Sequence, residues 1–404
     1  MAVFYLVGLF EPLEEAFVDW EQRLIAVKES GASFALIAIE RIPSDRPWPW
    51  PRLDYALLLR GLIPELPQSV VFEPDMHDED PHFSSFDAAF SRRVDRVDNV
   101  VFSAEAMQVP DGSAVRTSAL PADAVTLRLL GARPRLVPFA SVLWPVRTFS
   151  AHRPVGIANF DADRDQIVRR LPLVFRIGDR IVPSLALTAA GVRLGADWSR
   201  STFAPGGEII LRDHTAGTGR ILRRIPVDSE GRLRLRLRKP GLTALRINYD
   251  DFLLYADERE RGVTPAVDLT QLARRQVWVG ATDPAAGDPK RTVLGPMAPV
   301  EIQLRAAAQI VRGEFIAPVP GLCIALLFAV TGSLMACLAQ SLAPGRAAAA
   351  IGGLIAAIFA LGIIAFELAE VSFPLVSLAI LGLGAFLAGR AAGAWEWEKG
   401  ESKS

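Results

Sequence analysis

Three long apolar runs dominate the C-terminal part of the chain. They cover about 319–340, 346–366 and 372–392, and none has a charged residue in its middle. An α-helix rises about 1.5 Å per residue, so each run of about 20 residues matches the ~30 Å hydrocarbon core of a bilayer. A helix packed on a soluble core would show a polar stripe, and these runs show none. The pattern therefore predicts three transmembrane α-helices.

Between residues 30 and 300 the apolar positions form shorter runs. Four runs rich in β-branched and aromatic residues are typical of buried strands: 34–40, 69–75, 99–105 and 275–282. Two segments have apolar residues at helical spacing, 52–66 and 86–97. Strand and helix thus alternate through 34–105, which predicts an α/β domain with a layered mixed sheet.

Two later segments have patterns of their own. Arginine alternates with apolar residues through 232–239, which predicts an edge strand with one arginine face in solvent. Residues 298–316 place Val300, Leu304 and Ala307 on one side of a helix that precedes the first long apolar run. We expect this helix to connect the α/β domain to the membrane.

The N-terminal segment 1–28 is apolar at first and amphipathic afterwards. Residues 1–10 are too few to cross a bilayer, and they lack the basic start and the cleavage site of a signal peptide. Large apolar residues recur at helical spacing at Phe10, Leu13, Phe17, Trp20 and Leu24. We expect an amphipathic helix to about Lys28, preceded by the last half of a truncated first membrane helix.

Basic residues beside the apolar runs predict the orientation in the membrane. Arg346 lies after the first run, whereas the loop after the second run carries only Glu367 and Glu370. Because basic residues mark the cytoplasmic side, the first loop and the C-terminal tail are expected inside. The chain then divides into an N-terminal helix over 1–28, an extracytoplasmic domain over 29–317, membrane helices over 318–393 and a cytoplasmic tail over 394–404.

Composition narrows the chemistry. The formal net charge of -1 gives no indication of a nucleic-acid partner. Both cysteines, Cys323 and Cys337, lie in the first long apolar run, so the polar part of the chain has neither a disulfide framework nor a cysteine-based zinc site. No P-loop and no nucleophile elbow occurs in the sequence, and we predict no cofactor and no catalytic residue.

An acidic segment follows the second predicted strand. Besides Glu73 and Glu79 it contains Asp75, His77, Asp78, Asp80 and His82. Carboxylates and imidazoles suit a divalent metal, and the ligands would be Asp75, His77, Asp80 and His82, but their spacing matches no known metal motif. The favoured interpretation is a solvated loop in which Asp80 or Ser84 caps the next helix, so no metal site is predicted.

A loop of alternating tryptophan and proline follows the first predicted strand. Proline fixes φ and favours extended neighbours, so this loop is stiff. Trp48 and Trp50 could stack on a ligand at the edge of the sheet, or they could pack the loop against the sheet, and the second interpretation is favoured. We expect Arg52, which follows them, to pair with Glu40 or Asp75 at the same edge.

Several segments occur in the order known from one family. They are DWEQRL at 19–24, WPWPR at 48–52, VFEPDM at 71–76, and the stretches 156–173 and 277–313. With the three apolar runs they resemble the type-two CHASE domain family, a sensory extracellular domain associated with cyclases and histidine kinases. The resemblance implies a non-enzymatic sensor of an unknown extracellular signal, anchored in a bacterial inner membrane.

The sequence departs from the family pattern at three places. Glu40 stands where aspartate is usual, Asp165 is followed by Gln166 instead of glycine, and Gln303 stands near the position of a usual His-Ala pair. Family members often continue into a cyclase or kinase, whereas this chain ends about a dozen residues after the third run. We expect a sensor that signals through a separate output protein or as a homo-oligomer. A structural envelope protein and a metal-dependent hydrolase are the alternatives.

The ligand-binding candidates are residues expected at the carboxyl edge of the sheet, where open α/β sheets bind ligands. They are Glu40, Trp48, Trp50, Arg52, Asp75, His77, Asp78, Asp80, Asn159 and Asp161. Asp161 begins a turn of alternating aspartates, but a calcium loop is excluded because Gln166 and Pro172 stand where glycine and glutamate are needed. A turn bonded by its own side chains, with Arg169 or Arg170 as partner, is favoured.

Overall fold

The chain folds into two compact units, each with its own hydrophobic core. Residues 27–315 form one unit, and residues 1–26 with 316–404 form the other. The computed structural model describes residues 10–24, 27–45, 48–80, 83–107, 120–131, 136, 138–139, 141–215, 219–238, 240–319, 321–369 and 371–401.

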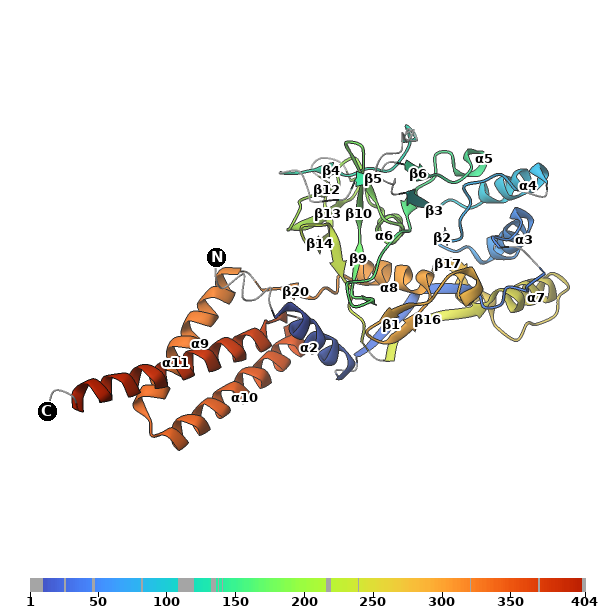
Figure 1. The fold of residues 1–404 in the computed structure, drawn as a ribbon. Coiled ribbons are helices and arrows are strands. Elements are labelled where there is room, and N and C mark those ends of the chain that lie inside the picture. Colours follow the sequence, from blue (N-terminus) through green and yellow to red (C-terminus); the bar gives the residue numbers. More distant parts are fainter. Residues whose placement is uncertain are drawn as a thin grey trace. The chain divides into compact units, whose positions relative to one another are not determined.

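The larger unit is built on a mostly parallel sheet (Figure 1). Its strand order is β16-β1-β17-β2-β3, and β3 also pairs with antiparallel β6 and parallel β7. The bounds are β1 Val27–Ile39, β2 Ser69–Phe72, β3 Val100–Met107, β6 Ser141–Leu143, β7 Val155–Ile157, β16 Pro240–Asn248 and β17 Gln276–Ala281. The register aligns Leu36, Trp278, Val71 and Val101 across β1, β17, β2 and β3.

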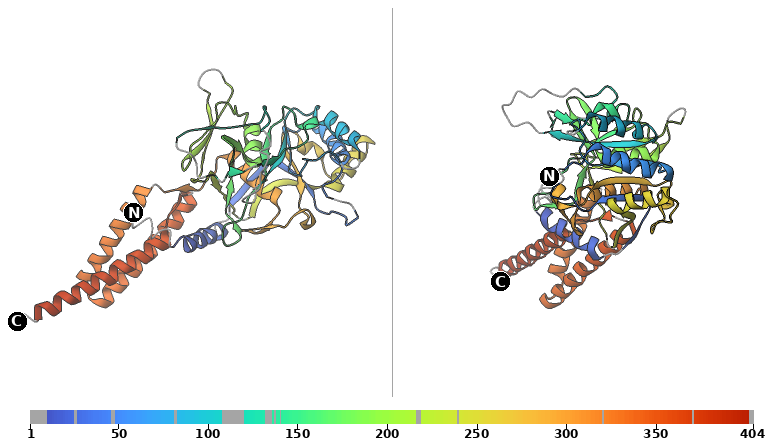
Figure 2. Two further views of the ribbon diagram at one scale, coloured as in Figure 1. Left: turned by 45° about the horizontal axis from the view of Figure 1, so that its top comes forward. Right: turned by 90° about the vertical axis from the view of Figure 1, so that its right-hand side faces the viewer.

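Helices pack on both faces of this sheet, because successive side chains of each strand point to opposite faces. One face carries Ile37, Phe72 and Val279, and its helices are α3 (Arg52–Leu62), α4 (Ser84–Val94) and α7 (Tyr249–Glu260). Figure 2 shows α3 between α4 and α7. The other face carries Leu36 and Trp278, and its helices are α6 (Leu185–Leu194) and α8 (Pro299–Arg312).

Shorter strands form small sheets within the same unit. β10 pairs with β11 and β5, β13 pairs with β14 and β12, β12 pairs with β4, β15 pairs with β9, and β18 pairs with β19 and β8. The bounds are β4 Arg128–Leu129, β5 Pro138–Phe139, β8 Ile167–Val168, β9 Arg170–Pro172, β10 Val174–Ile177, β11 Arg180–Pro183, β12 Thr202–Phe203, β13 Glu208–Arg212, β14 Ile221–Pro226, β15 Arg232–Arg234, β18 Lys290–Thr292 and β19 Gly295–Met297. Short helices lie at α5 Arg147–Ser150, η1 Ile63–Glu65, η2 Leu269–Leu272 and η3 Pro284–Ala286.

The start of α6 lies directly against β7. A Cβ atom on Gly156 would lie 2.6 Å from the Cα atom of Leu185, so only glycine permits this approach. Ser184 caps α6, because its hydroxyl accepts the backbone N–H of Leu187 at 3.2 Å. The end of β7 is thereby held close to the start of α6.

The smaller unit contains three apolar helices long enough to cross a membrane. They are α9 Gly321–Ser341, α10 Pro344–Ala369 and α11 Leu375–Glu401, with spanning segments 321–341, 344–368 and 375–392. β20 (Ala317–Pro318) pairs in parallel with β21 (Val371–Ser372), so the strand before α9 is bonded to the loop before α11. α2 (Glu11–Leu24) contacts α11, and the Glu14 carboxylate accepts the N–H groups of Val376 and Ser377.

The predicted fold class is confirmed, since an α/β domain with a layered sheet precedes three apolar helices of membrane-spanning length. The N-terminal helix prediction is wrong at its end. The helix stops at Leu24 instead of about Lys28, because residues 27–30 pair as a strand with residues 240–243 of β16. The predicted membrane half-helix falls mostly on residues 1–9, which lie outside the described residues.

The prediction of a solvated arginine strand over 232–239 is also wrong. Only Arg232–Arg234 form a strand, and the side chains of Arg236 and Arg238 are buried. Arg236 forms an ion pair with the partly exposed Glu314 at 3.0 Å, so its buried charge has an acidic partner. The alternating pattern is real, but the arginine face is buried at Arg236 and Arg238 and half-buried at Arg232 and Arg234.

Candidate functional site

The tryptophan loop packs into the core of the larger unit. Trp50 is 2% exposed, and its ring meets the ring of Tyr249 edge-on at 4.9 Å between centroids and that of Trp48 at 5.9 Å. The Trp48–Pro49 peptide bond is cis. Trp50 therefore joins the loop to the start of α7, and a ligand could contact only the partly exposed Trp48.

Arg52 has partners other than the expected ones, so its predicted pairing with Glu40 or Asp75 is wrong. Its backbone N–H donates to the Asp80 carboxylate at 2.6 Å, and its guanidinium donates to the Asp78 carbonyl at 2.8 Å. The guanidinium also lies 3.7 Å from the carboxylate of Asp87 on α4. Arg52 and Asp80 are both buried, so they tie the acidic segment to the starts of α3 and α4.

The acidic segment does not act as one cluster. Asp80 faces Arg52 and also accepts the N–H of Phe83 at 3.2 Å. His77 lies between two aspartates, with its Nδ1 against Asp75 and its Nε2 at 3.2 Å from Asp78. Within the part of the chain that the structure describes, no three His, Cys, Asp or Glu side chains gather as metal ligands. His82 lies outside that part.

Glu40 ends β1 and holds the neighbouring strand. It accepts hydrogen bonds from Arg246 at 2.8 Å and from Asn248 at 3.0 Å, both on β16. These bonds, first that of Asn248 and then that of Arg246, lower the pKa of the Glu40 carboxyl. Arg246 also pairs with Glu301 in the first turn of α8. Glu40 thus links β1, β16 and α8.

A first concavity lies at the carboxyl ends of β2, β3 and β7. Its cavity volume is about 170 Å³, and its lining residues are Glu73, Asp75, Ser103, Ala104, Glu105, Ala158 and Asn159. Burial raises the pKa of Glu73 to about 7, and the neighbouring Asp75 charge adds to the rise. A hydrogen bond from the backbone of Ala281 opposes it. Glu73 can therefore change protonation near neutral pH.

A second, larger concavity begins at the same loop. Its cavity volume is about 190 Å³. Its lining residues are Leu136, Phe139, Asn159, Phe160, Asp161, Ala162, Asp163, Arg170, Pro172, Val174, Phe175, Glu230 and Arg232. Asn159 and Asp161, both predicted ligand-binding candidates, line this space, and Asn159 also lines the first concavity.

The loop between these concavities is held from both sides. The Asn159 side chain accepts the N–H of Ala106 at 2.6 Å and donates to its carbonyl at 3.1 Å, so it extends the pairing of β3 with β7. Asp165 accepts two hydrogen bonds from Arg169, at 2.8 and 2.7 Å. The predicted side-chain-bonded turn is confirmed, and Gln166 takes a positive φ of 64° within it.

The comparison with known families agrees with this architecture. A family model described as CHASE2 domain matches residues 1–338. The chain belongs to the CHASE2 family. No curated protein matches the chain, and no solved structure does. CHASE2 domains are sensory, so this is a membrane sensory protein whose extracytoplasmic domain is anchored by C-terminal apolar helices.

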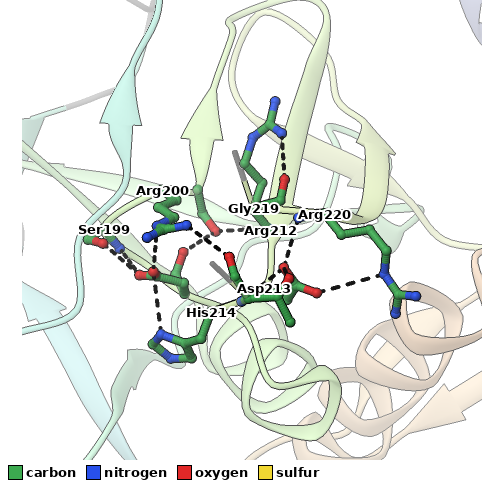
Figure 3. Close-up of polar contacts among 10 residues, drawn as sticks. Ser199, Arg200, Arg212, Asp213, His214, Gly219 and Arg220 are labelled. Atoms are coloured by element: carbon green, nitrogen blue, oxygen red, sulfur yellow. Dashed lines mark hydrogen bonds and ion pairs between the residues drawn. The ribbon is translucent and has the colours of Figure 1, made fainter. Parts of the chain in front are cut away.

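The CHASE2 domain has a further polar cluster beside the β13–β14 hairpin (Figure 3). The Asp197 carboxylate accepts the N–H and the hydroxyl of Ser199 at 3.0 and 2.6 Å. It also faces Arg200 at 3.1 Å and the exposed His214 at 3.4 Å. The Ser199 hydroxyl bond is the main cause that lowers the pKa of Asp197. Asp213 likewise binds N–H groups of its own hairpin. The hydrogen bonds of Asp197 and Asp213 thus stabilise the turns in which these two residues lie.

The most informative contacts that sequence reasoning missed are those of α8. Gln303 is 1% exposed, and its carboxamide donates to the Ala158 carbonyl at 2.9 Å and accepts the N–H of Ala186 at 3.1 Å. Gln309 likewise accepts the N–H of Arg236 at 3.0 Å and donates to the Arg234 carbonyl at 2.9 Å. The sequence signal was the presence of two glutamines among the apolar positions of a helix that also carries Glu301, Arg305 and Arg312.

Proposed function

We propose that the CHASE2 domain receives an extracytoplasmic signal at the carboxyl edge of its sheet and passes it through α8 to the membrane helices. The response is then produced by a separate partner protein or by a second copy of the chain, and the domain itself performs no catalysis. Arg346 and Arg390 support an orientation in which the first membrane loop and the C-terminus face the bacterial cytoplasm.

The Gln303 carboxamide is the observation that carries this proposal. Ala158 follows β7 directly and lines the first concavity, and its carbonyl is bonded to Gln303. A buried amide whose partner moves away loses about 1–3 kcal/mol. A change in the loop at Ala158 must therefore either shift α8 or break this bond.

The far end of α8 is also tied down. Arg223 donates from its Nε atom to the carbonyls of Ile310 and Val311 at 3.1 Å each. α8 ends at Gly313, whose φ of 75° suits glycine, and Glu314 bonds to Arg236 and Arg312. Residues 313–320 then lead into α9. These contacts make α8 a stiff element between the concavities and the membrane segment.

A signal can move this element only if it binds two arrangements of the domain unequally. The pairing of β20 with β21 supports the next step, because it bonds the segment after α8 to the loop before α11. Movement of residues 317–318 would then reach the start of α11 as well as that of α9. The signal then has two routes to the membrane helices: the chain itself, which continues into α9, and the β20–β21 hydrogen bonds, which lead to α11.

Replacement of Gln303 by methionine tests the link. The variant keeps the length of the side chain but leaves the Ala158 carbonyl and the Ala186 N–H without partners. We expect hydrogen exchange of the full chain in lipid nanodiscs to accelerate about tenfold in residues 156–160 and also in residues 313–319. Gln271, an exposed glutamine, provides the control Gln271→Met, which should change neither segment.

The two segments give separate information. Faster exchange in 156–160 with unchanged exchange in 313–319 would show that α8 does not relay the change, and it would refute the proposal. Faster exchange throughout the sheet would instead reveal general unfolding.

A further inference from the structure

We propose that the second concavity binds a small organic cation with an apolar body. The proposal deepens the sensory function above and rests on it for its biological meaning, while the binding itself is tested independently. Three kinds of observation support it: the apolar floor of the concavity, the balance of its charges and the position of Asp161.

The floor of the concavity is apolar and rich in phenylalanine. Phe139 and Phe175 meet edge-on at 5.6 Å between ring centroids, and Phe160 comes from the loop after β7. Leu136 and Val174 complete the apolar lining. The cavity volume of about 190 Å³ is below the ~300–1,000 Å³ that is usual for sites of drug-sized ligands, so the concavity suits a small ligand.

The wall at β9 and β15 is closely packed. Gly231 has a φ of 68°, and a Cβ atom there would lie 2.4 Å from a methyl carbon of Val174. The Gly231 carbonyl accepts the N–H of Leu173 at 2.9 Å. The turn that carries Glu230 and Arg232 is therefore fixed against the floor, and the concavity has a preformed wall.

Acidic groups outnumber basic groups in the lining. Asp161, Asp163 and Glu230 face the concavity together with Arg170 and Arg232. Arg232 pairs with Asp228 at 2.9 Å and with Glu230 at 3.2 Å. Arg170 lies 3.6 Å from Asp163. Both arginines thus have acidic partners, and the charge that is left over in the lining is negative.

That excess charge belongs to Asp161. Its side chain is exposed, and none of the described residues donates a hydrogen bond or forms an ion pair with it. The loop on either side is anchored, by Asn159 to Ala106 and by Asp165 to Arg169. Asp161 is therefore presented at the rim by a fixed backbone.

A negative rim above aromatic rings selects for cations. An ammonium group gains from the carboxylate and from the faces of nearby aromatic rings, while the apolar body of the ligand covers the floor. An anion would meet the unpaired Asp161 carboxylate and two arginines that already have partners. The complementary ligand is a small amine or quaternary ammonium compound with an aromatic or aliphatic body.

Three probes of similar shape and different charge test this inference. They are 2-phenylethylamine, 2-phenylethanol and phenylacetate, titrated calorimetrically against the full chain in nanodiscs, with empty nanodiscs as the blank. We expect the amine to bind about tenfold more tightly than the alcohol and the acid to bind least. Equal affinities, tighter binding of the acid, or no binding of the amine would overturn the proposal.

Two variants locate the site. Asp161→Asn should weaken amine binding about five- to tenfold and leave binding of the alcohol unchanged, because it removes only the charge. Asp98→Asn makes the same change at an exposed aspartate near the amino end of β3 and should have no effect. Amine binding that is indifferent to Asp161→Asn would refute the assignment of the site.

The site and the relay can fail separately. Amine binding that depends on Asp161 but leaves hydrogen exchange in residues 313–319 unchanged would support the site and contradict the relay through α8. Faster hydrogen exchange in both 156–160 and 313–319 of Gln303→Met, together with no amine binding in the unmodified chain, would support the relay and overturn the site.

Discussion

The pKa of Glu73 makes the stability of the larger unit depend on pH near neutrality. The carboxyl lies beside Gly280, where an added Cβ atom would come within 3.0 Å of its Oε2 atom, and burial raises its pKa from 4.5 to about 7. In the unfolded chain it titrates near 4.5. The unfolded state therefore ionises first as the pH rises, which disfavours folding.

The sign and the size of the effect follow from that difference. Below about pH 4.5 the carboxyl is protonated in both states and costs nothing. The cost grows between pH 4.5 and 7 and is constant above, at about 3 kcal/mol for a shift of this size. Glu73 retains some exposed surface, so this value is an upper limit. Glu73→Gln, which resembles the protonated acid, should remove the cost.

The assay is urea unfolding of the full chain in nanodiscs, followed by the fluorescence of the buried Trp50 and Trp278. At pH 8 the variant should be more stable than the unmodified chain by up to about 3 kcal/mol, and the difference should vanish near pH 4.5. Because the comparison is a difference between two chains, the titration of carboxyls that do not interact with Glu73 cancels.

Glu105→Gln is the matched control, since Glu105 lines the same concavity with an exposed side chain. It should leave the free energy of unfolding unchanged at every pH. If Glu73→Gln shifts stability equally at pH 4.5 and pH 8, or lowers it at pH 8, then the carboxyl is not held protonated by burial and the reasoning is wrong.

Two further predictions concern the loop and the acidic segment. Trp50→Ala should lower the free energy of unfolding by about 3–5 kcal/mol in the same urea assay, because it removes a buried indole. The control Leu254→Ala, at an exposed site of α7, should change the free energy of unfolding by no more than about 0.5 kcal/mol. Equal effects of the two substitutions would contradict the assignment of Trp50 to the core. Asp80→Ala should cost about 2 kcal/mol through loss of the bonds to Arg52 and Phe83, whereas Asp78→Ala, with a side chain 87% exposed, should cost little. Comparable costs for the two aspartates would contradict the network.

Much of the fold was predictable, because its signals are local. The segments FALIAI, SVVF, VVF and QVWVGA are short apolar runs, and the structure places the four strands that contain them side by side in the main sheet. The spans are longer apolar runs of a length that only a membrane requires. Such patterns depend on periodicity along the chain and not on distant partners.

The site was less predictable. Asn159 and Asp161 were identified as candidates, and both line the larger concavity. The tryptophan-proline loop has the composition of a surface on which a ligand could stack. Only the contact of Trp50 with Tyr249 shows that Trp50 lies in the core. Arg52 was assigned to the wrong acids because several carboxylates share the same edge, and the choice among them depends on the angles at which α3 and α4 begin.

The sequence by itself therefore determined the family, the alternation of strands and helices and the membrane spans. The tertiary structure decided which charges are buried and what they contact. Arg236 reaches Glu314 across 78 residues, and Arg246 reaches Glu40 across 206. Hydrophobic periodicity reports which face of an element is covered, whereas the partner of a polar group depends on which distant segment covers it, and only the packed chain brings the two together.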